Sequence, residues 1–364
     1  STLSPSSAAS DVYKRQLYGC ALIAVVSMAA IATSYFIARV GTENDDAEQL
    51  PELYSAYLGG WAKWLALAGM AIYQLGASVG YLLAISTTLA DISGAPVRSW
   101  ILVVWLMALF LVICGVRVVG KVGAALFALS LAVISFIILY LTPHVDGTRL
   151  LAGDPLYVLD VFGVAVFALV GHGIIMDIRR ELDKDDVVFS ALVGPVLPAL
   201  LYIAFPLVVC GALPATLISY CQDNGLPPTI PLGHVYGEVL LCAGAFYVVV
   251  ACFSSLLCFS LSLANALKEA LFKGRSSRAL TASACIIAML PCLIIALVDP
   301  TCFANALSIG GAIGGGLYAG ILPSMMALRA RNVSLKVKLL AIFALLIFAG
   351  GMAYEVLTHM GWSL

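Results

Sequence analysis

The feature that most constrains this chain is a series of ten apolar segments, each close to the length that crosses a membrane. A helix rises about 1.5 Å per residue, so about 20 apolar residues span the hydrocarbon core of a bilayer. We therefore predict an all-α polytopic membrane protein with about ten transmembrane helices. The segments lie near Leu17–Ala38, Trp64–Leu89, Trp100–Val116, Val122–Leu141, Leu159–Ile178, Val187–Gly211, Val235–Leu267, Leu280–Val298, Ala304–Leu328 and Val337–Leu357.

The composition agrees with this class and excludes others. Hydrophobic residues make up 62% of the chain and charged residues 11%, whereas soluble domains are about 25% charged. The net charge of -1 does not favour nucleic acid as a partner. The sequence has no CxxC motif or Cys/His cluster with metal-ligand spacing, so we expect neither a metal nor a cofactor. The expected partners are the lipid bilayer and a small solute; the sequence does not indicate an oligomeric state.

The basic residues predict the orientation of the segments. Fifteen of the 19 Lys and Arg residues fall in loops that follow odd-numbered segments, and only Arg98 and Arg149 follow even-numbered ones. Since basic loops stay in the cytoplasm, we expect the odd loops inside, the C-terminus outside and the first segment running inward. We expect a prokaryotic plasma-membrane protein with one preceding span missing, and residues 1–16 to be a non-native or disordered tail.

The fifth segment, VLDVFGVAVFALVGHGIIMDI (Val158–Ile178), predicts a functional site. Glycine disfavours helix by about 1 kcal/mol, and an ionisable side chain at membrane depth is costly enough to suggest function. We expect a break near Gly171, His172 and Gly173 that exposes backbone groups to a polar solute. Alternatively, His172 bonds to the backbone of a neighbouring helix and the glycines allow close packing. The candidate substrate-binding residues of this segment are Phe167, Ala168, Val170, Gly171, His172 and Gly173.

Several stretches of the sequence resemble those of the amino acid/auxin permease family, in particular of its aromatic amino-acid branch. FALVGHGIIMDIRREL (Phe167–Leu182) is similar to that family's sixth helix, and GPVLPALLYIAFP (Gly194–Pro206) to the helix that follows. LPCLIIALVDPTCFANALSIGGAIGGGLYAGILPSMM (Leu290–Met326) resembles its ninth and tenth helices. ELYSAYLGGWAKWLALAGMAIYQLGASVGYLLA (Glu52–Ala84) resembles its third helix and the preceding loop.

The resemblance implies a leucine-transporter-like fold with two inverted five-helix repeats. The ten segments would then be helices two to eleven, without the glycine-rich first helix that supplies half of the family's site. The implied organisation is four spans of the first repeat over 17–141, five spans of the second over 158–328, and an additional span over 337–357. The implied function is secondary active transport of neutral or aromatic amino acids by alternating access, coupled to H⁺ or Na⁺.

Polar residues on two other segments are further candidates. Tyr73, Gln74, Ala77 and Tyr81 fall on one helical face at about 100° per residue, which suits a pocket wall or a helix–helix contact. On the seventh segment, Ser254 and Ser255 are candidates for a Na⁺ site, or for hydrogen bonds between helices. The glycines between Gly310 and Gly320 have no adjacent Lys-Ser/Thr pair, so close helix packing explains them better than a phosphate loop.

Two other classes remain open beside a transporter. A membrane-embedded enzyme would need clustered Asp, His or Cys residues at the lipid–water boundary, whereas the acidic residues here are scattered over loops. A ligand sensor could keep a transporter fold without flux, and binding without uptake would distinguish it. We expect a transporter and not an enzyme.

Overall fold

The computed structural model describes residues 16–41, 47, 49–150, 155–179, 182–224, 229–272, 277–331 and 333–361. Within these ranges the regular structure is entirely helical, which confirms the all-α prediction. The predicted tail lies outside them, apart from Gln16. Ten helical stretches are long and apolar enough to cross a membrane, as predicted. They are Tyr18–Gly41, Gly60–Ser93, Val97–Cys114, Ala125–His144, Val158–Met176, Lys184–Ala212, Glu238–Lys268, Arg278–Val298, Phe303–Arg329 and Leu335–His359.

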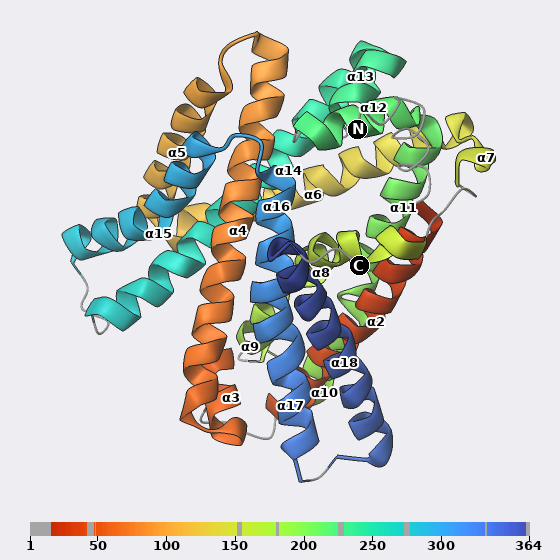
Figure 1. The fold of residues 1–364 in the computed structure, drawn as a ribbon. Helices are drawn as coiled ribbons and strands as arrows, with labels where there is room; N and C mark the ends of the chain where they lie inside the picture. Colours follow the sequence, from red (N-terminus) through yellow and green to blue (C-terminus); the bar gives the residue numbers. More distant parts are fainter. Residues whose placement is uncertain are drawn as a thin grey trace. The chain divides into compact units, whose positions relative to one another are not determined.

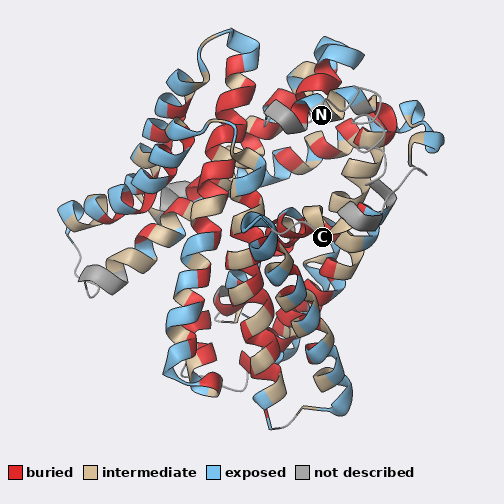
Figure 2. Cartoon of the chain, viewed as in Figure 1, coloured by how far each residue is buried: buried red, intermediate tan, exposed pale blue. Residues whose placement is uncertain are grey.

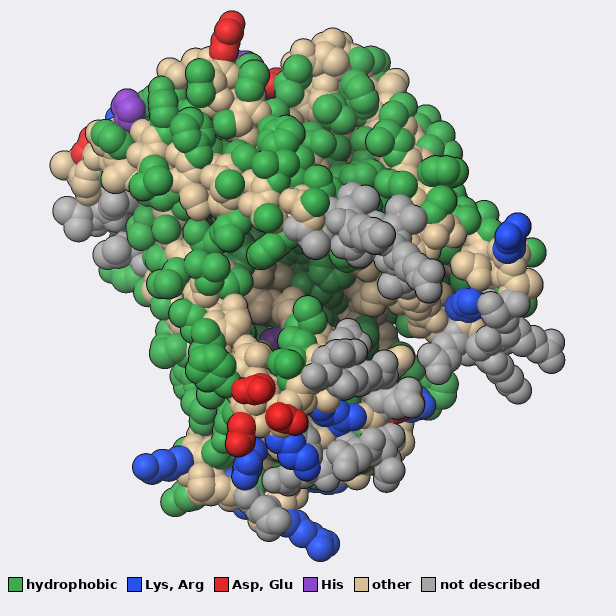
Figure 3. All heavy atoms as spheres, turned by 180° about the vertical axis from the view of Figure 1, so that it is seen from behind, with side chains coloured by type: hydrophobic (Ala, Val, Ile, Leu, Met, Phe, Trp, Pro, Cys, Tyr) green, Lys and Arg blue, Asp and Glu red, His purple; other side chains and the backbone are tan. Residues whose placement is uncertain are grey.

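The surface of the molecule suits lipid. Figure 3 shows hydrophobic side chains over most of the visible face, with the Lys, Arg, Asp and Glu side chains gathered in a few places. Along single helices, buried and exposed residues alternate in stripes (Figure 2). Large apolar side chains such as Phe110, Leu139 and Val298 are at least two-thirds exposed. Lipid is as apolar as these side chains, so their exposure costs little in a bilayer.

The chain forms two compact units, each assembled from stretches that are distant in sequence. The first unit contains Gln74–Gly153 and Phe205–Leu307, and the second contains Leu17–Tyr73, Asp154–Ala204 and Ser308–Leu364. Both units therefore combine residues from the two predicted repeats. The division into repeats at 17–141 and 158–328 stays a prediction.

The first unit is built around long helices that share apolar cores. Its elements are the later part of α4 (Gly60–Ser93), α5 (Val97–Cys114), α6 (Val116–Leu141), η1 (Thr142–His144), α7 (Gly147–Leu150), the later part of α11 (Val196–Ala212), α12 (Ala215–Asn224), α13 (Thr229–Tyr236), α14 (Glu238–Phe272), α15 (Arg278–Val298) and most of α16 (Phe303–Ile309). Figure 1 labels the α-helices among them. Residues of α4, α5, α14 and α15 form one core, in which the Trp105 indole N–H donates to the Met289 carbonyl at 2.9 Å. A second core joins α6 to α14 and the segments around α11 and α13.

The second unit holds the predicted break. Its elements are α2 (Gln16–Gly41), α3 (Leu50–Leu58), the beginning of α4, η2 (Pro155–Val161), α8 (Phe162–Leu169), α9 (Gly173–Ile178), α10 (Lys184–Val193), the beginning of α11, η3 (Gly310–Ile321), α17 (Leu322–Arg329) and α18 (Leu335–His359). The short helix α3 buries Leu53 and Tyr54, and the Tyr54 hydroxyl donates to the Tyr318 carbonyl at 2.7 Å. This bond ties α3 to η3.

The glycine-rich stretch η3 is a π-helix that packs closely against its neighbours. A Cβ atom added to Gly311 would lie 1.9 Å from the Gly163 carbonyl oxygen, and one added to Gly314 would lie 2.4 Å from the Tyr73 nitrogen. A Cβ on Gly320 would lie 2.2 Å from the Phe348 ring. These approaches confirm that the glycines serve close helix packing. The π-helical geometry is a finding that the spacing did not predict.

Candidate functional site

The fifth span is interrupted where the Gly-His-Gly sequence predicts a break. Helix α8 ends at Leu169, and Val170 follows with an extended backbone (φ -83°, ψ 107°). Helix α9 begins at Gly173, so Val170, Gly171 and His172 lie between two half-helices. The prediction of a broken helix is therefore confirmed, while the binding of a substrate there stays a prediction.

Within the described residues, the break leaves several backbone groups of the fifth span without hydrogen-bond partners. The amides of Gly171, His172 and Gly173 and the carbonyls of Ala168 and Leu169 make no hydrogen bond with another described residue. Such groups are costly in a bilayer unless they face water or a polar solute. The break therefore offers donors and acceptors that could bind the two charged ends of an amino acid.

Tyr73 supports the other carbonyls at the end of α8. Its hydroxyl lies 3.0 Å from the Phe167 carbonyl oxygen and 3.1 Å from that of Val170, so it donates to both in a shared geometry. The Tyr73 residue is only 2% exposed, and its ring lies 5.3 Å from the Phe167 ring and 5.6 Å from the Tyr318 ring. Through these two hydrogen bonds, Tyr73 stabilises the backbone of the break.

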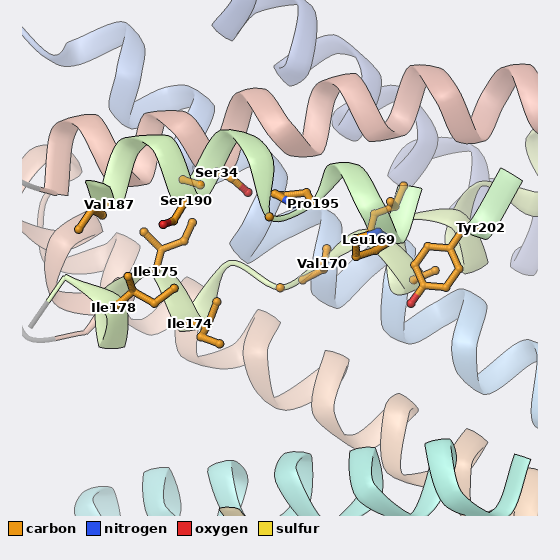
Figure 4. A pocket seen from close by; sticks show the side chains of 15 residues that line it. Ser34, Leu169, Val170, Ile174, Ile175, Ile178, Val187, Ser190, Pro195 and Tyr202 are labelled. Carbon is orange, nitrogen blue, oxygen red and sulfur yellow. The ribbon is translucent and has the colours of Figure 1, made fainter. Parts of the chain in front are cut away.

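A cavity of about 350 Å³ lies beside the break (Figure 4). Its walls come from the break, α9, α10, the start of α11 and one residue of α2. In Figure 4, Tyr202 is drawn near Leu169 and Val170, whereas Ile178 and Val187 mark the opposite end. The lining is mainly apolar, and its residues are Ser34, Ala168, Leu169, Val170, Gly171, Ile174, Ile175, Ile178, Val187, Ser190, Ala191, Gly194, Pro195, Pro198 and Tyr202.

The sixth span is also weakened where it faces this cavity. Pro195 and Pro198 have no N–H, so the carbonyls of Ala191 and Gly194 lose their usual partners one turn on. Helix α10 ends at Val193 and α11 begins at Val196, with Gly194 and Pro195 between them. The backbone at Gly194 stays helical (φ -53°, ψ -45°), so the span continues through this junction with fewer hydrogen bonds. This wall was not predicted from the sequence, although the Gly-Pro pair and the second proline could have indicated it.

His172 is fully buried and does not line the cavity. Its Nε2 atom lies 2.7 Å from the Thr33 hydroxyl of α2. Its Nδ1 atom is buried and has no hydrogen-bond partner among the residues that the structure describes. The partner is thus a side chain of a neighbouring helix. Thr33 was not predicted to contact the break, because its apolar surroundings in the sequence give no signal.

The other predicted pocket residues belong to the first unit, which is described by itself. The Gln74 amide donates to the Ser262 hydroxyl at 2.8 Å, and the Tyr81 ring stacks on Phe259 at 5.9 Å. Ala77 is fully buried. These are helix–helix contacts, and a role for Gln74, Ala77 and Tyr81 in substrate binding stays a prediction.

The candidate sodium ligands also lie in the first unit. The Ser254 hydroxyl donates to the Ala251 carbonyl in its own helix at 3.0 Å. Ser255 is partly buried on the same helix. A role of Ser254 and Ser255 in binding Na⁺ stays a prediction.

Arg179 lies directly after α9 and links this half-helix to α2. Its Nη1 atom donates to the Gly41 carbonyl at 2.5 Å, and its Nη2 atom donates to the Ala47 carbonyl. The guanidinium thus bonds to the last described carbonyl of α2. Arg180, its neighbour, lies outside the described residues.

Comparison with known proteins supports a transporter. Residues 14–357 match the tryptophan/tyrosine permease family, and no curated protein is similar to this chain in sequence. The fold is similar to that of the Eremococcus coleocola manganese transporter in complex with an aromatic bis-isothiourea substituted compound. The TM-score is 0.62 at 12% identity, over 98% of this chain and 87% of that chain. The fold of this chain is also similar to that of MhsT in complex with L-phenylalanine. The TM-score is 0.50 at 14% identity, over 96% of this chain and 92% of that chain.

At these identities the solved structures establish the architecture alone, and they have the predicted leucine-transporter-like fold. The family match is the stronger finding, because it covers nearly the whole chain. A membrane transporter is therefore the class that the matches support, in preference to an enzyme. This chain belongs to the tryptophan/tyrosine permease family.

Proposed function

We propose that this chain is a secondary active transporter of neutral amino acids, with aromatic ones preferred, and that it works by alternating access around the break in its fifth span. The observation that carries the proposal is the set of backbone groups of Ala168, Leu169, Gly171, His172 and Gly173 that have no hydrogen-bond partner in the described part of the chain. Ala168, Leu169 and Gly171 also line the cavity. The carbonyls would accept from the α-ammonium group of the substrate, and the amides would donate to its carboxylate.

The apolar part of the cavity supports an aromatic side chain. Ile174, Ile175, Val187 and Pro195 line it, and burying an apolar side chain there is favourable by about 25 cal/mol per Å². A volume of about 350 Å³ falls in the range of about 300–1,000 Å³ that is typical of small-molecule sites. The description of the family as tryptophan/tyrosine permeases supports the same class, as does the L-phenylalanine named with MhsT.

Coupling to H⁺ or Na⁺ is part of the proposal. One charge that moves through 100 mV releases about 2.3 kcal/mol, which supports a solute gradient of roughly 50-fold at about 1.36 kcal/mol per decade. His172 is the candidate for a proton and Ser254 with Ser255 for sodium. We further propose a relation to the amino acid/auxin permeases, a prokaryotic plasma membrane as the location and an external C-terminus.

The test is uptake of labelled L-tryptophan, L-tyrosine and L-phenylalanine into proteoliposomes that contain the purified chain. A proton gradient, a sodium gradient and no gradient are compared, and Mn²⁺ uptake is followed in parallel because a manganese transporter shares the fold. We expect gradient-dependent, saturable uptake of aromatic amino acids. Mn²⁺ uptake without amino-acid uptake would contradict the proposal.

The His172→Ala variant tests the role of the break. We expect slower uptake, because the substitution removes the residue that joins the break to α2. The matched control is His234→Ala, since His234 in the first unit has a side chain that is 62% exposed. Unchanged affinity and rate in His172→Ala would count against the break as the site. Binding without uptake in the unmodified chain would instead favour a ligand sensor.

A further inference from the structure

Two hydroxyl groups in the second unit differ from most hydroxyls on the spans. Serine and threonine side chains within helices usually donate to a carbonyl one turn back. Ser27 donates to Ile23 at 2.7 Å in this way, and Ser324 donates to Gly320 at 2.7 Å. Ser34 and Ser190 make no side-chain hydrogen bond anywhere in the described part of the chain. Both line the cavity beside the break.

Both serine hydroxyls are accessible from the cavity. Ser34 is only 4% exposed and Ser190 is partly buried on α10, yet neither oxygen is among the fully buried side-chain atoms that lack a partner. Tyr202 adds a third hydroxyl to the wall, whereas Ile175, Val187 and Ala191 have no polar side-chain group. The two serine hydroxyls are therefore available to bond to a polar group in the cavity.

The rest of the cavity indicates what that group is. The break carries the backbone donors and acceptors that suit an amino-acid head group, so the serines are available to the side chain of the substrate. The walls between them are apolar and suit a ring. A ring with one polar group on its edge therefore matches this lining better than a purely apolar ring.

We infer that Ser34 and Ser190 recognise the polar edge of an aromatic substrate side chain, namely the indole N–H of tryptophan or the phenol O–H of tyrosine. This inference rests on the proposed function. A serine oxygen accepts from either group, and the serine O–H can also donate to the phenol oxygen. A site built in this way disfavours a substrate that lacks the polar group, because its own hydroxyls are then left unpaired. The transporter is thus expected to prefer tryptophan and tyrosine to phenylalanine.

The experiment measures KM for the three amino acids in proteoliposomes with the full chain and with Ser34→Ala, Ser190→Ala and the double variant. Each single variant is expected to raise KM for tryptophan and tyrosine roughly 2- to 10-fold, which is the effect of one lost hydrogen bond. KM for phenylalanine is expected to stay unchanged, and the double variant is expected to lose the preference. Ser190→Thr, which keeps a hydroxyl, should retain the preference.

Ser27→Ala is the matched control, since Ser27 lies on the same helix as Ser34 and its hydroxyl is satisfied within that helix. It should leave all three KM values unchanged. An equal change for the three substrates in the cavity variants, or no change, would overturn the inference while the proposed function stands. Absence of uptake and binding of every amino acid by the unmodified chain would overturn the proposed function, and this inference with it.

Discussion

The Thr33 hydroxyl and the His172 Nε2 atom lie 2.7 Å apart and join α2 to the break in the fifth span. Thr33 also donates to the Ala30 carbonyl at 3.0 Å. A hydroxyl has one proton, so a Thr33 hydroxyl that donates to Ala30 accepts from the Nε2–H group of His172.

The first prediction concerns this bond. Thr33→Val keeps the shape but removes the hydroxyl, so the imidazole N–H loses its partner. We expect the free energy of unfolding to fall by about 1–3 kcal/mol and uptake to slow. Thr33→Ser, which keeps the hydroxyl, should come close to the unmodified chain. Thermal unfolding in detergent and uptake in proteoliposomes measure both effects; a Val variant that matches the Ser variant would contradict the assigned bond.

The second prediction concerns Tyr73. Tyr73→Phe removes the donor to the Phe167 and Val170 carbonyls, and we expect a loss of about 1–3 kcal/mol in stability. Amide exchange around the break should also become faster, because its backbone loses a support. Tyr140→Phe is the control, since Tyr140 is 38% exposed on α6. Equal stability and exchange in the two variants would show that the Tyr73 hydroxyl does not hold the break.

The third prediction uses two neighbouring glycines of η3. A Cβ on Gly314 would lie 2.4 Å from the Tyr73 nitrogen and 2.7 Å from the Gly69 oxygen, so backbone must move to admit it. On Gly316 the nearest atoms would be 3.9 Å away. Gly314→Ala should therefore destabilise the chain by about 1–3 kcal/mol, while Gly316→Ala should be neutral or slightly stabilising. The melting temperatures of the two variants measure this difference. A lower melting temperature for Gly316→Ala than for Gly314→Ala would contradict the packing described for η3.

The fourth prediction concerns Arg179. Arg179→Ala removes the donors to Gly41 and Ala47, and we expect a loss of about 1–3 kcal/mol. Arg179→Lys should recover only part of this, because an ammonium group lacks the forked geometry that reaches two carbonyls. Arg331→Ala, at an exposed position, is the control. Thermal unfolding of the purified variants provides the measurement, and a Lys variant as stable as the unmodified chain would show that charge alone suffices.

The sequence by itself determined the number and position of the spans and the place of the break. Both are local properties. The length of an apolar run determines whether its helix can cross a membrane, and a Gly-His-Gly sequence weakens the helix that contains it. The close packing of the ninth span could be predicted for the same reason, since small residues at helical spacing allow close approach of another helix.

Only the tertiary structure decided which residues complete the site. Thr33, which was not predicted, contacts the break from 139 residues away in sequence. Tyr73 was a sequence candidate, but its contact with the break, 94 residues away, came only from the fold. Ser34 and Ser190 line one cavity from two different spans. In a membrane helix nearly every face is apolar, because lipid and protein neighbours favour the same side chains. The pattern along one span therefore does not indicate which face meets which partner, and that choice is made by packing between helices.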